Sequence, residues 1–164
     1  LLLAGGGGGS GTPLREPGTP AGAGRGPSAG LAAVTSLGVP LTHREHAHGV
    51  VFVTGHAKPG DTGTDWRALA ATAHQARLTL VIYMGVSGAG HIQDELLFGL
   101  PGDTPVAIIQ NASLPHQRQA TCSLGELQAT IAREGLASPS VIVVGDVIRG
   151  VAAASVPELQ VRTA

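Results

Sequence analysis

Side chains that could do chemistry gather in one short stretch, LTHREHAHGVVFVTGHAK, at residues 41–58. Its charged and titratable members are His43, Arg44, Glu45, His46, His48, His56 and Lys58. Arginine forks onto carboxylates and phosphates, so a cationic cluster in a nearly neutral chain favours an anion-binding patch. An ordinary solvated loop is the alternative, because exposed His and Arg are common on protein surfaces.

The same stretch raises the question of a metal, since His43, His46 and His48 follow an H-x-x-H-x-H pattern. Structural and catalytic zinc sites usually complete such a set with cysteines or with a carboxylate at a recognisable spacing. No spacing of that kind is present, so no metal site is expected from the sequence.

A second candidate is TLVIYMGVSGAGHIQDEL at residues 79–96, where an apolar run ends in Tyr-Met and glycines follow. A strand that stops at a glycine-rich turn before a helix commonly has a ligand at its carboxyl end. The glycines at 85, 88 and 90 reverse the G-x-G-x-x-G spacing of dinucleotide loops. GVSGA also lacks the last glycine of the G-x-S-x-G hydrolase motif around Ser87. Neither motif therefore describes what this turn holds.

Composition excludes several classes of function. Ten Lys and Arg against eleven Asp and Glu give a net charge of −1, and aromatic residues are 2% of the chain. Nucleic-acid affinity needs clustered positive charge or stacking platforms, so no nucleic-acid partner is expected. Cys122 is the single cysteine, which fits a reducing compartment. No apolar run reaches the roughly 20 residues of a membrane helix. The sequence predicts a cytoplasmic protein with no membrane span.

The elements that must position these residues follow from periodicity and from glycine and proline. Residues 1–27 are dominated by Gly and Pro and are predicted to be disordered. From Ser28 onward, patterns predict helices at 28–38, 66–76, 88–98 and 124–135, and strands at 49–55, 78–85, 104–111, 118–124 and 140–147. Helices alternating with strands that are apolar on both faces indicate an α/β fold with a mostly parallel sheet of about five strands and flanking helices. One antiparallel hairpin is expected between 104–111 and 118–124.

Three blocks of the chain carry a family resemblance. GVPLTHREHAHGVVFVTGHAK, then LVIYMG, then TPVAIIQNAS followed by QR resemble, in order and spacing, the C-terminal half of uroporphyrinogen-III C-methyltransferases. These enzymes form part of the tetrapyrrole methylase family. The resemblance covers residues 28–153 and leaves 154–164 as a C-terminal tail.

The resemblance implies a fold, a cofactor and site residues. The family has two α/β domains that hold S-adenosyl-L-methionine between them, usually in a homodimer. Met84 matches the methionine that packs on the cofactor, with Gly85 beside it. Ala112 matches a position whose backbone approaches the adenosyl group, and Ser28-Ala29 fall where the family has a Thr/Ser-Ala pair.

For the substrate, Arg44 of PLTHR and the adjacent His43 are the expected contacts to carboxylates. The implied reaction is methylation of two ring carbons of uroporphyrinogen III to give precorrin-2, on the siroheme and cobalamin routes. A later precorrin methyltransferase is the rival within the same class.

The resemblance stops at Ser28, where RGP replaces the family's PGI, and the family's GxGPGD loop and proton-handling residues are missing. No catalytic residue is therefore expected in this chain, which would be a fragment lacking the N-terminal half. The alternative is a non-catalytic truncated module that folds or dimerises without turnover.

Overall fold

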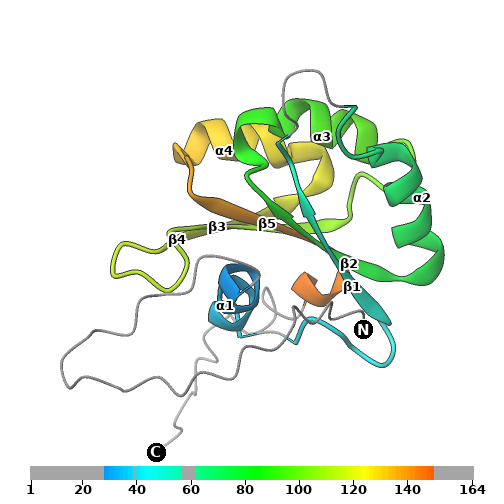
Figure 1. The fold of residues 1–164 in the computed structure, drawn as a ribbon, viewed down its shortest axis with the longest axis horizontal. Helices are drawn as coiled ribbons and strands as arrows, with labels where there is room; N and C mark the ends of the chain where they lie inside the picture. Colours follow the sequence, from blue (N-terminus) through cyan, green and yellow to red (C-terminus); the bar gives the residue numbers. More distant parts are fainter. Residues whose placement is uncertain (1–27, 39, 57–61, 150–164) are drawn as a thin grey trace, which may run out of the picture.

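The computed structural model of the protein describes residues 28–38, 40–56 and 62–149. Its centre is one five-stranded sheet in the order β1-β2-β5-β3-β4 (Figure 1). The strands are β1 (Gly49–Thr54), β2 (Leu78–Tyr83), β3 (Pro105–Gln110), β4 (Arg118–Ser123) and β5 (Ser140–Val144). All five lie within the predicted ranges. The expectations for 1–27 and 154–164 fall outside the described residues.

The sheet is mixed, so the prediction of a mostly parallel sheet was wrong. Only β1 and β2 pair in parallel, whereas β2–β5, β5–β3 and β3–β4 are antiparallel. The β3–β4 hairpin, which was predicted, makes β4 antiparallel to β3. After β4, α4 leads the chain back across the sheet, so that β5 is antiparallel to both of its neighbours, β2 and β3. All five residues of β5 are buried. Burial on both faces makes a strand apolar whichever way it runs, and for this reason the pattern did not reveal its direction.

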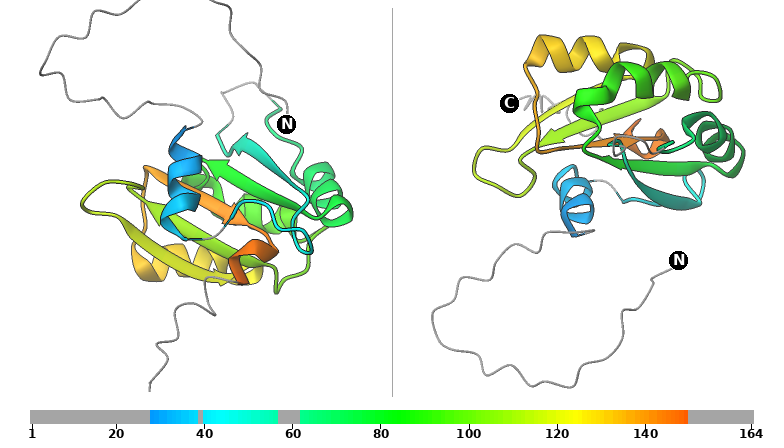
Figure 2. Two further views of the ribbon diagram at one scale, coloured as in Figure 1. Left: turned by 90° about the horizontal axis from the view of Figure 1, so that it is seen from below. Right: turned by 45° about the horizontal axis from the view of Figure 1, so that its top comes forward.

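Helices cover the two faces of the sheet unequally (Figures 1 and 2). One face carries α2 (Trp66–Ala76), α3 (Ala89–Leu96) and α4 (Leu127–Glu134), and the other carries α1 (Ser28–Ser36) and a 3-10 turn at Asp146–Ile148. Alternate residues of β2 divide between them, with Leu80 and Ile82 in the three-helix core and Val81 in the α1 core.

Local sequence signals set the ends of these helices. Asp65 caps α2, accepting a hydrogen bond from the Ala68 N–H at 3.0 Å. Gly135 ends α4 in the left-handed conformation at φ 61°, where glycine carries no Cβ penalty. Both positions agree with the predicted helix ranges 66–76 and 124–135.

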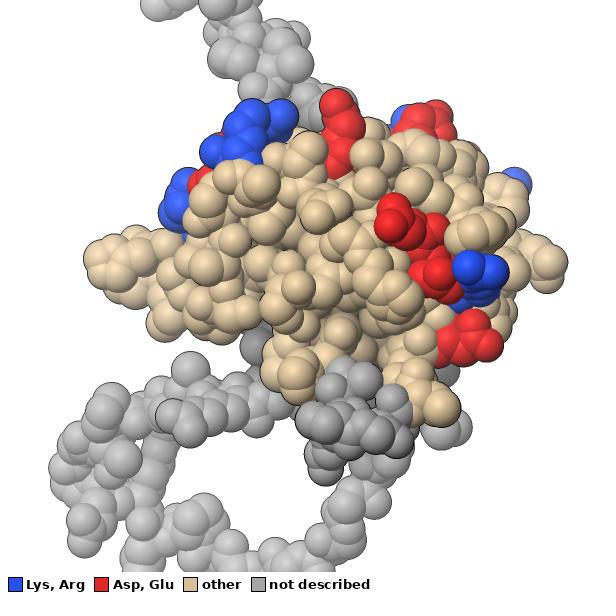
Figure 3. Space-filling model, turned by 90° about the horizontal axis from the view of Figure 1, so that it is seen from above, with Lys and Arg blue, Asp and Glu red and all other residues tan. Residues whose placement is uncertain are grey.

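The surface of the three-helix face mixes charges of both signs (Figure 3). On it Arg67 pairs with Glu95 at 2.7 Å and lies over the Phe98 ring at 3.7 Å, linking α2 to the end of α3. Among the described residues, no helix is long and apolar enough to cross a membrane.

Candidate functional site

The turns that follow β1, β2 and β3 lie at one edge of the sheet, called here the strand-end edge. It comprises Gly55-His56, Met84-Gly85 and residues 111–113. Tyr83 and Ile109 both lie opposite Val141 of the intervening β5. Two strand spacings therefore separate the ends of β2 and β3, about 10 Å. The sheet thus places the neighbourhoods of Met84 and Ala112 at the same edge, on either side of β5.

The backbone at this edge adopts a conformation that side chains usually avoid. Met84, Asn111 and Ser113 have φ values of 52°, 52° and 66°. Asparagine tolerates this region, but for a residue such as methionine it costs on the order of 1 kcal/mol. Met84 is nevertheless 56% exposed, so little packing offsets that cost. Strain of this kind clusters at ligand sites, and an exposed apolar thioether is suited to an apolar ligand.

Two glycines bring the ends of β1 and β2 together. A Cβ added to Gly55 would lie 2.5 Å from the Cα of Gly85, and the Gly55 N–H donates to the Tyr83 carbonyl at 2.6 Å. Neither turn can shift to make room for a side chain, because the close contact is between the two backbones. The sequence signal for this contact is the glycine that closes each strand, in the endings VTG and YMG.

The turn after β3 is held by its own polar groups. The Asn111 N–H donates to the Pro139 carbonyl at 3.0 Å, and the Ser113 N–H donates to Gln117 Oε1 at 2.9 Å. Ala112, between them, is half-buried against the α1 core. The position expected to approach an adenosyl group is therefore flanked on both sides by hydrogen bonds that hold the turn.

Tyr83, which the sequence analysis did not single out, connects α1 to the strand-end edge. Its hydroxyl accepts a hydrogen bond from the Gly30 N–H at 3.0 Å. Burial raises the pKa of the phenol, and the Gly30 N–H partly opposes that rise. Ser28 and Ala29, of which only the backbone is described, form the start of the same helix. Tyr83, the residue next to Met84, therefore ties the start of α1 to the strand-end edge.

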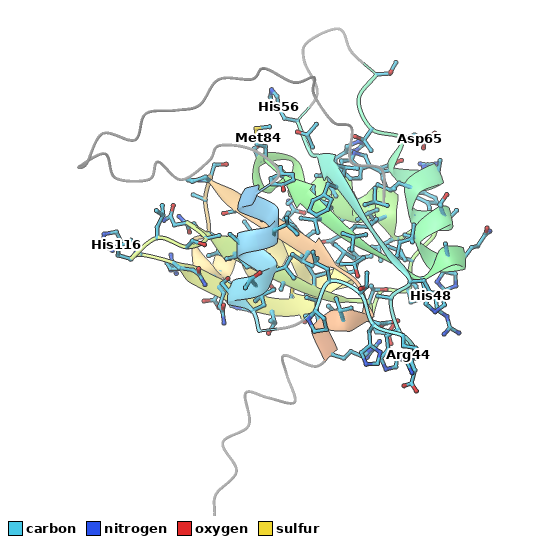
Figure 4. All side chains as sticks on the ribbon, turned by 60° about the horizontal axis from the view of Figure 1, so that its bottom comes forward. Arg44, His48, His56, Asp65, Met84 and His116 are labelled. Atoms are coloured by element: carbon cyan, nitrogen blue, oxygen red, sulfur yellow. The ribbon has the colours of Figure 1, made fainter. Side chains whose placement is uncertain are left out.

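The basic cluster at 41–58 does not stay together. His56 follows β1 and lies at the strand-end edge near Met84, while Arg44 and His48 lie at the opposite edge (Figure 4). The six residues of β1 separate them by about 20 Å of strand. Lys58 falls outside the described residues. The residues of the basic cluster therefore lie at two separate edges of the sheet, and only His56 lies beside Met84.

Arg44 and His43 are exposed in the turn before β1. Arg44 makes no side-chain hydrogen bond or ion pair with the described residues. A cavity of about 320 Å³ opens nearby, with His46, His74, Arg77, Asp103, Asp146 and Arg149 among its lining residues. Arg149 is paired there with Asp146 at 3.1 Å, so this cavity mixes both signs of charge.

Comparison with known proteins decides the family. A family model for tetrapyrrole (corrin/porphyrin) methylases matches residues 12–128. The chain belongs to the tetrapyrrole methylase family. The match includes the β1 and β2 ends, Met84 and Ala112, and it begins ahead of Ser28.

Individual tetrapyrrole methylases match closely over part of their length. A siroheme synthase from Pseudoalteromonas translucida is 47% identical over 111 residues, which are 67% of this chain and 23% of that protein. A uroporphyrinogen-III C-methyltransferase from Pseudomonas aeruginosa is 43% identical over 125 residues, 76% of this chain and 49% of the relative. The chain thus spans about a quarter of the first relative and about half of the second.

Among solved structures, a uroporphyrin-III C-methyl transferase from Thermus thermophilus complexed with S-adenyl homocysteine superimposes with a TM-score of 0.56 at 34% identity. The superposition covers 70% of this chain and 51% of that one. The five-strand α/β fold predicted from the sequence, with the correction of its strand directions, is that of a tetrapyrrole methylase.

Proposed function

We propose that the strand-end edge binds S-adenosyl-L-methionine and that the chain is the C-terminal part of a uroporphyrinogen-III C-methyltransferase. The observation that carries this proposal is Met84, held exposed at φ 52° at the same edge as the β3 turn, two strand spacings or about 10 Å away. A relative with that name matches the chain, and a uroporphyrin-III C-methyl transferase of similar structure was solved with S-adenyl homocysteine.

The residues of the edge fit such a cofactor. Met84 offers an apolar, polarizable surface for the adenosyl group, and Gly85 and Ala112 allow backbone to approach it closely. Ser28-Ala29 would contribute from α1, which Tyr83 holds in place. When bound, S-adenosyl-L-methionine supplies an electrophilic methyl group. The chain's own part is to bind and orient, and orientation of two reactants is a large source of acceleration.

The substrate side of the proposal involves two edges. His56 lies beside Met84, and we propose it as a contact to a substrate carboxylate close to the cofactor (Figure 4). Arg44 and His43 remain proposed carboxylate contacts. About 20 Å of strand separates them from the strand-end edge, so they would serve a part of the tetrapyrrole, or a copy of the chain, away from the methyl group.

We propose that the chain alone catalyses methyl transfer slowly. It spans 49% of the Pseudomonas aeruginosa relative, and a binding site that lacks half of its residues holds the two reactants poorly. The whole enzyme is proposed to act as a homodimer on uroporphyrinogen III. The shortness of the match also supports the rival hypothesis, a module that folds without catalysing.

Two measurements test the proposal. Calorimetric titration of the chain with S-adenosylhomocysteine should detect binding that Met84→Lys weakens and that His74→Gln, in the last turn of α2 at the opposite edge, does not. The chain is then mixed with the N-terminal half of the Pseudomonas aeruginosa relative, uroporphyrinogen III and the methyl donor, and precorrin-2 is followed. Formation of product only in the mixture supports the enzyme. Binding without product in the mixture supports the non-catalytic module, and absence of binding contradicts the cofactor site.

A further inference from the structure

A cluster of three ligand-bearing side chains lies in the turn before β1, at the edge opposite Met84. His43, Glu45 and His46 each offer one ligand atom, and these atoms lie within 4.8 Å of one another. All three residues are exposed. His43 and His46 belong to the H-x-x-H-x-H pattern of the sequence, in which no carboxylate stands at a usual zinc-site spacing. The fold of the turn brings Glu45 to them.

The backbone of this turn is fixed before any ion binds. The His43 N–H donates to the Ala47 carbonyl at 2.8 Å, and the Ala47 N–H donates back to the His43 carbonyl at 2.9 Å. Ala47 is buried in the α1 core, and Arg77 Nη1 donates to the Glu45 carbonyl at 2.9 Å. The turn is therefore anchored at both its base and its tip, and only side-chain rotamers remain to be ordered.

The side chains already face one another. The His43 and His46 rings are stacked, with centroids 4.8 Å apart and an interplanar angle of 16°. His46 Nε2 lies 3.9 Å from Glu45 Oε2. Ligand atoms on one tetrahedral zinc ion are about 3.3 Å apart, given bonds of about 2.0–2.1 Å. Rotation of exposed side chains spans the difference.

We propose that His43, Glu45 and His46 bind a divalent transition-metal ion. Two imidazoles and one carboxylate form a donor set that suits zinc, with water in the fourth position. Calcium and magnesium are disfavoured, because they prefer oxygen ligands throughout. Arg44, between the ligands in sequence, takes no part and keeps its proposed role as a carboxylate contact, whereas His43 cannot fill that role while it holds the ion.

One existing contact must give way. The Glu45 N–H donates to His43 Nδ1 at 3.2 Å, so that nitrogen is an acceptor in the absence of an ion. Coordination at Nδ1 displaces this bond, and coordination at Nε2 requires the proton to sit on Nδ1. Either route changes the environment of the Glu45 amide. The backbone N–H resonance of Glu45 is therefore a local reporter of ion binding.

The test uses the full chain, freed of metal with a chelator and titrated with zinc chloride against a chromophoric chelator. We expect one equivalent to bind, and His46→Gln and Glu45→Gln each to weaken binding by roughly 10-fold or more, the scale seen when a metal site loses a supporting group. His116→Gln and His91→Gln are matched controls, because both residues are exposed histidines on other elements. These controls should bind zinc as the parent does.

Cobalt supplies a second measurement, since a nitrogen- and oxygen-ligated tetrahedral site gives visible absorption that both ligand variants should lose. Far-UV circular dichroism checks that the variants are folded, as expected for exposed positions. The proposal is overturned if the chain binds no zinc, if the control variants weaken binding as much as His46→Gln does, or if the Glu45 amide resonance stays unchanged at saturation. No tetrapyrrole or methyl donor is present, so failure here leaves the proposed methyltransferase untouched.

Discussion

The Tyr83 hydroxyl accepts a hydrogen bond from the Gly30 backbone N–H at 3.0 Å, and this contact joins β2 to the start of α1. The pair is close by necessity, since a Cβ on Gly30 would lie 2.1 Å from the hydroxyl oxygen. Glycine is therefore required at position 30 for the hydroxyl to reach the backbone. The contact places the predicted cofactor segment at 28–29 over the strand that ends beside Met84.

Tyr83→Phe should lower the free energy of unfolding by about 1–2 kcal/mol, because the Gly30 N–H is left without this acceptor in a buried position. Urea denaturation of the two proteins measures the difference. S-adenosylhomocysteine should also bind the variant more weakly if α1 contributes to the site. An unchanged unfolding midpoint would mean that the contact contributes nothing to stability.

Gly30→Ala should destabilise the chain by about 1–3 kcal/mol, as overpacking of a tight contact does, because α1 must move away from Tyr83. Gly102→Ala is the matched control, since a Cβ there would meet Leu97 at an ordinary 3.7 Å. Thermal unfolding of both variants compares them. Equal melting temperatures would contradict the close packing of α1 on β2.

The contribution of Tyr83 to the free energy of unfolding should decrease at alkaline pH. Burial raises the pKa of Tyr83 above its usual 10.0, so the folded state favours the neutral phenol. Its contribution is fully present below pH 10 and is lost as pH rises through the unfolded pKa toward the folded one. The stability difference between the parent and Tyr83→Phe should therefore shrink above about pH 10. Urea midpoints at pH 8 and above pH 10 test this, and a constant difference would refute it.

Met84→Gly should separate stability from binding. Glycine relieves the left-handed backbone, so the free energy of unfolding should rise by up to about 1 kcal/mol, while the exposed side chain takes little packing with it. Affinity for S-adenosylhomocysteine should fall. Calorimetry and urea denaturation measure the two effects, with Met84→Ala as the control that keeps the strain. Unchanged affinity in both variants would remove Met84 from the proposed site.

Arg44→Ala should weaken tetrapyrrole binding by about 1.5–3 kcal/mol in an assembled two-domain enzyme, the scale of a hydrogen bond to a charged group. Arg44→Lys should rescue it only in part, since lysine cannot fork onto a carboxylate. Affinity for S-adenosylhomocysteine should not change, because Arg44 lies at the opposite edge from Met84 (Figure 4). A loss of cofactor affinity in Arg44→Ala would contradict that separation.

Much of the architecture could be predicted from the sequence, because local rules determine it. Apolar runs bounded by glycine and proline located the five strands, and helical patterns located the four helices, with Asp65 just before α2 and Gly135 at the end of α4. The PLTHR, VTGH and YMG blocks pointed to the tetrapyrrole methylase family, which the family match confirmed. Capping, turn formation and motif identity depend on residues close together in the chain, and these the sequence displays directly.

Only the tertiary structure determined the strand directions and which residues are neighbours in space. The direction of β5 could not be predicted, because burial on both faces makes its sequence apolar in either direction. The cluster at 41–58 looked like one patch until β1, extended at about 3.3 Å per residue, carried His56 to one edge and left Arg44 at the other. The partnership of Tyr83 with Gly30 joins positions 53 residues apart. Contacts of that range arise from packing of the sheet against α1, and no local pattern records them.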